Sequence, residues 1–475
     1  MSTSKRLSQS ITGSWKDATY FNSPTFVPSA EDDIEEWLAA WRTVFARDLI
    51  DSRIVPVDAE TSVEEACELL LAEDIPCLAV RGRLSEPNAG TPYHGLFDFA
   101  DVNAFLTLAA TRHTLLPEDL RANSRVDDIV TAAKAGRVPV HLVSNLSEKN
   151  PIEILPHNAT VVSLLEVFSR GAHRSLVRSS VNPDEFVGMV SDRSLLFWFD
   201  SYARETPSFH KYLSNPIQTL SLPSLNLNAA VVASKSSATI LDAMKLMSEQ
   251  GVSSIAVVEE QRGILLSAVS VTDIGKFVVP SQSNQILTTP LHHFIAQIKE
   301  IDGSTDGADR YPVYSVFPSS LLSYTIEKLL ATNAHRLFVT RESGPASPTL
   351  SPSFQGNLTG IVSVVDILSL FARAAKIENI DPTQMQRHRR ASSASSSLSD
   401  RDLFNRSRSN SRTSIRKSPA VIASSPPNSN SGISVLDLLD SSRSPVNVPV
   451  LDSLALQRKT SRRSAPVPVK KDSVG

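Results

Sequence analysis

Two kinds of residue recur at matching places in this chain, and their chemistry suits binding. A His-Arg pair opens an apolar stretch twice, as His173-Arg174 and as His335-Arg336. An Asp follows another apolar stretch three times, as Asp101, Asp273 and Asp366. An Arg guanidinium presents a fixed fork of donors that suits phosphate, and a neighbouring His can share a proton in the same cluster. A carboxylate can accept two hydrogen bonds from a pair of adjacent hydroxyl groups.

Each of these residues also has a structural explanation that needs no ligand. An Asp that follows a strand is a good helix N-cap. A His-Arg pair at a strand edge is often solvated or paired with a carboxylate. For any single position the structural explanation is the better one, whereas the recurrence at matching positions keeps ligand binding open.

The elements that carry these residues form a unit that recurs four times. Its order is strand, helix, strand, strand and helix, with a period of about 90 residues. One copy has only about 55–65 residues, which leaves a sheet face uncovered, so we expect neighbouring copies to pair. The expected helices span 63–73 with Thr61 as N-cap, 161–170 with Thr160 as N-cap, 195–203, 238–247 and 321–332.

An amphipathic helix is expected before the first copy. Ser29 is a suitable N-cap, and acidic residues fill the first turn after it. Apolar residues then recur at helical spacing, including Trp37 and Trp41. We expect the two tryptophans to bury this helix against the first domain, and the alternative is a docking surface for a partner.

The pattern predicts an α+β fold in which four repeats follow one another along the chain. Both ends of the chain are polar and Ser-rich, and we expect them to be disordered. The expected divisions are 1–30 for the disordered N-terminus, 31–50 for the N-terminal helix, 51–115, 150–205, 226–280 and 309–376 for the repeats, and 387–475 for the disordered basic tail.

The repeat resembles the CBS domain. The stretch Gly360-Ile361-Val362-Ser363-Val364-Val365-Asp366-Ile367 is close to the second-strand signature of that family, and related stretches stand in register in all four copies. CBS domains pair in tandem through their sheets, so the resemblance implies two tandem modules, at about 50–205 and 222–376. The layout is also similar to the nucleotide-sensing gamma subunit of AMP-activated kinase.

A closer resemblance is to a fungal family, the Sds/Moc-type four-CBS proteins. The residues that carry it are 62–67, 171–174, 252–258 and 269–273, with the junction Asp381-Pro382 and 387–393 after the last repeat. It implies a non-enzymatic regulator that inhibits type 2A-like protein phosphatases and acts in mitotic control, DNA replication, cell separation and stress growth. The alternative is a gamma-type subunit of a kinase complex, although that subunit has no counterpart to the junction or the tail.

The resemblance to nucleotide-binding CBS repeats also implies roles for the recurring residues. In such repeats an Asp at the start of the last helix takes both ribose hydroxyls, which implies this role for Asp101, Asp273 and Asp366. The second repeat has Ser194 at that position. The implied ligand is AMP, ADP or ATP, and no cofactor is required.

The cationic residues have an implied role as well. His173, Arg174, His335 and Arg336 match phosphate contacts of the kinase gamma subunit. The first and third repeats carry Asp74-Ile75 and Val252-Ser253 in that region, without a cation. Only the fourth repeat combines the His-Arg pair with the Asp, which makes it the best candidate half-site.

Several functional classes lack support in the sequence. Cys67 and Cys77 are expected to be reduced core thiols, and we expect no metal site because no Cys/His spacing suits one. There is no phosphate-binding Gly-rich loop, no Gly-x-Ser-x-Gly and no large second domain, so we expect no enzyme. His113 and His292-His293 are isolated, so we expect core or surface roles for them. The sequence has no run of 18 or more apolar residues, so we expect no membrane-spanning segment.

The tail differs from the body in charge. Residues 387–475 hold 16 Lys and Arg against 6 Asp, a net charge of +10, and the rest holds 31 against 44 acids, a net charge of −13. Ser392 follows two arginines, while Ser418 and Ser444 precede prolines, so we expect protein kinases to act on these three sites. Direct nucleic-acid binding is disfavoured because no aromatic residues interleave the basic clusters. The implied location is cytoplasm and nucleus.

Overall fold

The structure is a computed structural model of the chain. It describes residues 31–82, 91–111, 124–182, 184–225, 231–279, 284–301, 313–341 and 358–382. The expected disordered N-terminus and basic tail lie outside the described residues.

Four small sheets of identical topology form the framework. In each sheet a short strand pairs parallel with a second strand, which pairs antiparallel with a third. The predicted α+β fold with four CBS-like repeats is confirmed. The strands are β1 (Pro56–Val57), β2 (Cys77–Arg81) and β3 (Tyr93–Asp98) in the first repeat, β4 (Ile154–Leu155), β5 (Arg174–Arg178) and β6 (Phe186–Ser191) in the second, β7 (Ala233–Lys235), β8 (Ser254–Val258) and β9 (Leu265–Ser270) in the third, and β10 (Ser315–Val316), β11 (Arg336–Thr340) and β12 (Leu358–Ser363) in the fourth.

Two helices accompany each sheet, one after its first strand and one after its third. They are α2 (Val63–Ala72) and α3 (Phe99–Thr111), α6 (Val161–Phe168) and α7 (Asp192–Glu205), α9 (Ile240–Glu249) and α10 (Val271–Val278), and α12 (Leu322–Ala331) and α13 (Val364–Ala374). Further helices join or flank the repeats. They are α1 (Glu31–Trp41), α5 (Ser124–Lys134), α8 (Pro207–Leu213) and α11 (Leu291–Ile301), with short 3₁₀ turns η2 (Ala46–Leu49), η4 (Val140–Leu142), η5 (Ile217–Thr219) and η7 (Asn284–Thr288).

Side-chain caps determine where these helices begin. The prediction of Thr61 as the cap of α2 is wrong by one residue, because the partner acid must lie three residues after the cap. Ser62 Oγ accepts from the Glu65 backbone N–H at 3.2 Å, and the Glu65 carboxylate accepts from the Ser62 N–H at 3.0 Å. Thr160 is the N-cap of α6, as predicted. Helix α7 begins at Asp192, three residues before the expected start, because Ser191 Oγ accepts from the Ser194 N–H.

A left-handed residue follows the first helix of every repeat and sets the register of the next strand. These residues are Asp74 (φ 46°), Gly171 (φ 101°), Gly251 (φ 60°) and Asn333 (φ 55°). Gly and Asn adopt this conformation most readily. The second residue after each is Pro76, His173, Ser253 or His335. The histidines of the second and fourth repeats therefore correspond to Pro76 and Ser253, which corrects the predicted match with Asp74-Ile75 and Val252-Ser253.

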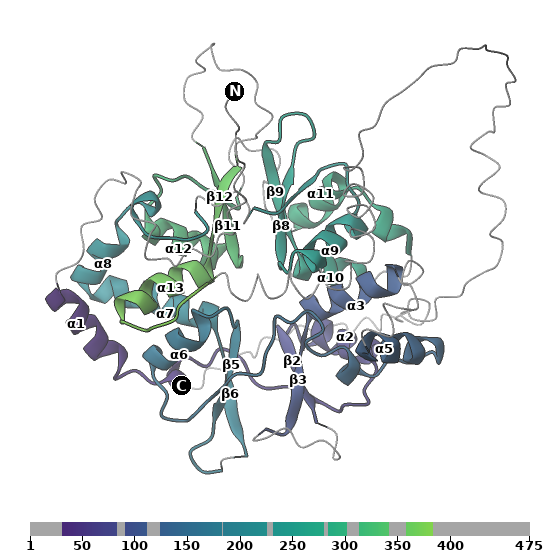
Figure 1. Ribbon diagram of the computed structural model, residues 1–475, viewed down its shortest axis with the longest axis horizontal. Helices are drawn as coiled ribbons and strands as arrows, with labels where there is room; N and C mark the ends of the chain where they lie inside the picture. The colour runs from purple at the N-terminus through teal and green to yellow at the C-terminus, as the bar shows by residue number, and fades with distance from the viewer. Residues whose placement is uncertain are drawn as a thin grey trace, which may run out of the picture.

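Neighbouring repeats pair through their sheets, which confirms the predicted tandem modules. The first module joins repeats one and two through Cys77, Ala79, Leu96, Leu176 and Met189. The second module joins repeats three and four through Ala256, Leu265, Ala268, Phe338 and Ile361. In Figure 1 the first module lies below the second.

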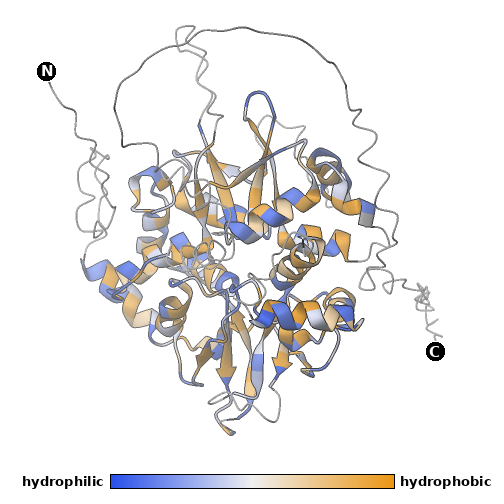
Figure 2. Ribbon diagram, turned by 45° about the vertical axis from the view of Figure 1, so that its right-hand side comes forward, coloured by the Kyte–Doolittle hydropathy of each residue, from blue (hydrophilic) through white to orange (hydrophobic). Residues whose placement is uncertain are grey.

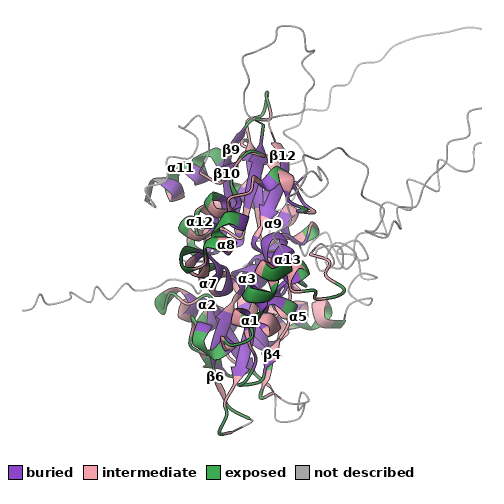
Figure 3. Cartoon of the chain, turned by 90° about the vertical axis from the view of Figure 1, so that its left-hand side faces the viewer, coloured by how far each residue is buried: buried purple, intermediate pink, exposed green. Residues whose placement is uncertain are grey.

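The two modules contact each other through their helices, and this creates two large cores. Helices of repeats two and four share one core, which includes Phe199 and Phe371. Helices of repeats one and three share the other, which includes Phe105 and Phe294. Figure 1 shows these pairs on the left and right, and Figures 2 and 3 show that the strands between them are apolar and buried. Repeat two thus faces repeat four, and repeat one faces repeat three.

Helix α1 is buried by its tryptophans, as predicted. Trp41 lies edge-on to Phe199 at 5.0 Å between ring centroids and tilted against Phe371 at 6.5 Å. Trp37 Nε1 donates to Ser208 Oγ at 2.9 Å. The helix therefore packs on repeats two and four, whereas the sequence pointed to the first domain.

No helix in the described ranges is both long and apolar enough to cross a membrane.

Candidate functional site

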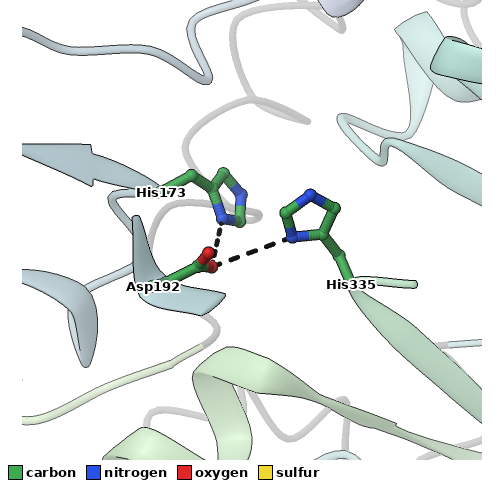
Figure 4. Close-up of side chains that lie close together, drawn as sticks. All are labelled: His173, Asp192 and His335. Carbon is green, nitrogen blue, oxygen red and sulfur yellow. Dashed lines mark hydrogen bonds and ion pairs between the residues drawn. The ribbon is translucent and has the colours of Figure 1, made fainter. Parts of the chain in front are cut away.

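Two histidines and an aspartate meet where repeat two faces repeat four. His173 Nδ1 and Asp192 Oδ2 are 2.8 Å apart, and His335 Nδ1 lies 3.8 Å from the same oxygen. The two imidazole rings tilt toward each other at 5.0 Å between centroids. Figure 4 shows all three side chains pointing to one place. We call these three residues the His-Asp-His cluster.

The repeat fold places each member of the cluster. His173 and His335 stand immediately before β5 and β11. Asp192 is the first residue of α7, and its backbone N–H donates to the His173 carbonyl at 3.0 Å. The same backbone bond joins Val364 to His335. Asp192 and His173 are therefore neighbours within repeat two, and His335 reaches them from repeat four.

Asp192 is the most deeply buried member of the cluster. Its side chain is 1% exposed, against 38% for His335. Burial alone would raise the pKa of Asp192, but the charges of His173 and His335 and the hydrogen bond with His173 outweigh it and hold that pKa well below its usual value. The cluster is thus a carboxylate that stays ionised between two imidazoles.

The neighbouring cation, Arg174, belongs to a different network. Its Nη1 lies 3.2 Å from Asp98 Oδ2 and donates to Asn150 Oδ1 at 3.2 Å. Burial opposes its charge, but Cys77, Asp98 and Asp192 more than compensate and raise the pKa of Arg174. Arg174 therefore joins repeat two to repeat one, and its guanidinium is engaged by protein acceptors.

Asp101 lies in that same network and is fully buried. Its Oδ1 accepts from the Ser147 N–H at 2.9 Å, and its Oδ2 accepts from the Asp98 N–H at 3.2 Å. Burial and the nearby charge of Asp98 raise the pKa of Asp101 to about 7. The candidate ribose-binding carboxylate of repeat one is thus held by the chain itself.

Asp366 is also buried and covered by the chain. Its Oδ1 accepts from Ser224 Oγ at 2.9 Å, and its other oxygen caps α13 through Ser363. The segment before repeat three runs so close that a Cβ on Gly360 would lie 1.7 Å from the Leu225 carbonyl oxygen. Burial raises the pKa of Asp366 above its usual value. Its hydrogen bonds and the charge of Arg336 oppose this shift but do not cancel it.

The other two matched positions differ from these. Asp273 caps α10 through Ser270 and is 22% exposed, with Lys299 Nζ at 3.6 Å from its carboxylate. Ser194 donates from Oγ to the Leu49 carbonyl at 2.7 Å. Among the candidates, the structure thus unites the two histidines and links Asp101 to Arg174 through Asn150, while Asp273 and Asp366 each cap a helix of their own repeat.

Asp192 is the site residue that sequence reasoning missed. In the other three repeats the first residue of the equivalent helix is Phe99, Val271 or Val364, and each is buried and apolar. An acid at this one apolar position was the available signal. The candidate phosphorylation sites Ser392, Ser418 and Ser444 lie outside the described residues, as does His113.

Comparisons with known proteins agree with this architecture. A family model described as the CBS domain matches residues 228–279. Protein SDS23 of Yarrowia lipolytica is 31% identical over 411 residues, which cover 81% of this chain and 77% of that relative. Protein sds23 of Aspergillus niger is 30% identical over 404 residues, with 75% and 77% covered. Protein sds23/moc1 of Schizosaccharomyces pombe is 29% identical over 367 residues, with 74% and 82% covered.

A solved structure is also similar. It is the Methanocaldococcus jannaschii protein described as a proposed archaeal homolog of g-AMPK, which matches with a TM-score of 0.45 at 14% identity. The match covers 69% of this chain and 100% of that one.

Proposed function

This chain belongs to the Sds23 family of regulatory CBS-domain proteins, and we propose that it acts without catalysis, by inhibiting a type 2A-like protein phosphatase. The proposal places it in DNA replication, mitotic control, cell separation and stress growth, in cytoplasm and nucleus. Family membership carries the proposal, because the similarity to Sds23 proteins spans both modules.

An exposed apolar surface supports a protein partner. Phe197 of α7 and Leu321 and Tyr324 at the start of α12 are large apolar residues that remain exposed. The two helices pack against each other, and Arg193 at the start of α7 donates to the Leu330 carbonyl near the end of α12 at 2.7 Å. Exposed apolar residues grouped on one face are typical of protein-binding surfaces. We assign the phosphatase contact to this α7/α12 surface.

The charge division supports regulation through the tail. The body carries −13 and the tail +10, so the two attract each other at moderate ionic strength. Phosphorylation of Ser392, Ser418 and Ser444 by protein kinases would reduce the tail's charge and weaken this attraction. Phosphorylation of the tail would thereby change how much of the body's surface a partner can reach.

An inhibition assay tests the phosphatase proposal. The full chain is added to a purified type 2A-like phosphatase holoenzyme, and dephosphorylation of a phosphopeptide is followed. We expect inhibition, and we expect Phe197→Ser with Tyr324→Ser to weaken it. Val187→Ser, at an exposed apolar position of β6, is the matched control. No inhibition by the wild-type chain would contradict the proposal, as would recovery of kinase catalytic and beta subunits, instead of a phosphatase, in affinity purification.

Adenine-nucleotide binding is a second candidate function, and Asp273 favours it. This carboxylate is part-exposed, and Lys299 supplies a cation beside it. Calorimetry with AMP, ADP and ATP tests the idea. We expect Asp273→Ala to abolish the heat of binding, with Asp366→Ala as the control because Asp366 is covered by the 221–225 segment. Absence of heat from all three nucleotides would leave these residues as helix caps.

A further inference from the structure

The His-Asp-His cluster has a donor set that is unusual for a helix start. It offers two imidazole nitrogens and a carboxylate, and all three ligand atoms lie within 4.8 Å of one another. His173 and Asp192 come from the first module, and His335 comes from the second. The cluster therefore forms only when the two modules are assembled.

Asp192 lacks a complete structural explanation. It replaces the buried apolar residue of the other three repeats and is almost fully buried itself. Its Oδ1 has no hydrogen-bond partner among the described residues. A buried carboxylate oxygen without a partner costs free energy. This oxygen is therefore open to a further ligand.

His335 also lacks a complete explanation. Its Nδ1 is buried and has no hydrogen-bond partner in the described parts of the chain. The 3.8 Å that separates it from Asp192 Oδ2 is too long for a hydrogen bond. The histidine is thus aimed at the carboxylate without bonding to it.

The spacing suits an ion placed between these atoms. Zinc lies about 2.0–2.2 Å from imidazole nitrogen and carboxylate oxygen, so ligand atoms around a tetrahedral ion are about 3.3 Å apart. The two observed distances, 2.8 Å and 3.8 Å, lie on either side of that value.

The charges favour a cation over an anion. A phosphate placed between the histidines would face the carboxylate of Asp192, and Arg174 is already engaged by Asp98 and Asn150. Two imidazoles with one carboxylate suit zinc and other first-row transition metals, whereas magnesium and calcium prefer oxygen ligands throughout.

We propose that His173 Nδ1, His335 Nδ1 and the Asp192 carboxylate bind a divalent transition metal, with Zn²⁺ as the first candidate. The ion ties the first module to the second at the contact between repeats two and four. Three protein ligands leave a fourth position for water or a further ligand.

Binding of Co²⁺ to the full chain, followed by its visible absorption and then by displacement with Zn²⁺, tests the proposal. We expect one metal per chain, and a Zn²⁺-dependent rise in melting temperature because the ion binds only the folded protein. His335→Gln should weaken affinity about 100-fold or more, since even outer contacts of metal ligands contribute 10–100-fold. His173→Gln should do the same, and both variants should lose the rise in melting temperature.

The chain offers a matched control in a second histidine pair. His292 and His293 are exposed, with ring centroids 4.2 Å apart. Replacing both with Gln should leave Co²⁺ and Zn²⁺ affinity unchanged. The proposal is overturned if the wild-type chain forms no one-to-one complex, if His335→Gln binds as the wild type does, or if the His292/His293 variant is the one that loses binding. His335 is part-exposed, so its variant is expected to fold and keeps the test decisive.

Discussion

The two modules contact each other on two sides, and the sides use different chemistry. Between repeats two and four, His335 crosses to the buried pair of His173 and Asp192. Between repeats one and three, Lys276 crosses to Asp74 at 3.0 Å, with both side chains largely exposed. The first side thus holds a buried cluster of ionisable side chains. On the other side the ion pair is solvated, and the buried polar contacts are hydrogen bonds to backbone carbonyls, from Asn103 Nδ2 to Met244 at 3.3 Å and from Lys149 Nζ to Val252 at 2.6 Å. Repeats one and three cannot form the same cluster, because Pro76, Ser253 and Phe99 stand at the positions of His173, His335 and Asp192.

Two buried aspartates show the same contrast. Asp192 is surrounded by imidazoles, and its pKa is lowered. Asp101 has another carboxylate, Asp98, beside it, and its pKa is raised to about 7. Burial is similar in the two cases, so the sign of the neighbouring charge decides the direction of each shift.

The largest effect is expected from a substitution in α1 that tests whether this helix packs on repeats two and four. Trp41→Ala should lower the free energy of unfolding by about 3–5 kcal/mol, because it leaves a cavity among buried aromatic rings. Hydrogen exchange should rise in α7, α8 and α13, which Trp41 contacts through Phe199, Phe209 and Phe371. An equal rise in α3 and α9 would show that the two cores are not separate. Denaturant unfolding supplies the free energy.

An intermediate effect is expected from Asp101→Asn. The folded pKa of Asp101 is raised, so its favourable contribution is complete below about pH 4 and is lost as pH rises through about 7. The loss amounts to at most about 4 kcal/mol. Replacement with Asn should therefore flatten the dependence of unfolding free energy on pH between these values. If the unfolding free energy of the variant changes with pH as steeply as that of the wild type, another group causes the dependence.

The smallest effect is expected from Lys276→Met. The ion pair with Asp74 is exposed, so its loss should cost no more than about 1 kcal/mol. Addition of salt should erase even that difference. A loss of several kcal/mol in thermal or denaturant unfolding would mean that the repeat-one and repeat-three side depends on a charged contact after all.

The repeat itself could be predicted from the sequence, but the cluster could not. Strand and helix patterns are local, so the four copies and their sheet pairing follow from residues close together in the chain. Asp192 acquires its role only because repeat two faces repeat four, which is a contact between residues more than 140 positions apart. Arg174 turns toward repeat one because Asp98 stands where the other repeats carry Ser, as in Ser270 and Ser363.

The most direct test of the difference between the two sides is an anomalous difference map at the zinc absorption edge, from crystals of the full chain equilibrated with Zn²⁺. We expect a strong peak about 2.0–2.2 Å from His173 Nδ1, His335 Nδ1 and the Asp192 carboxylate, and no peak beside Asp74 and Lys276. No peak between repeats two and four, or a peak only at His292 and His293, would contradict it.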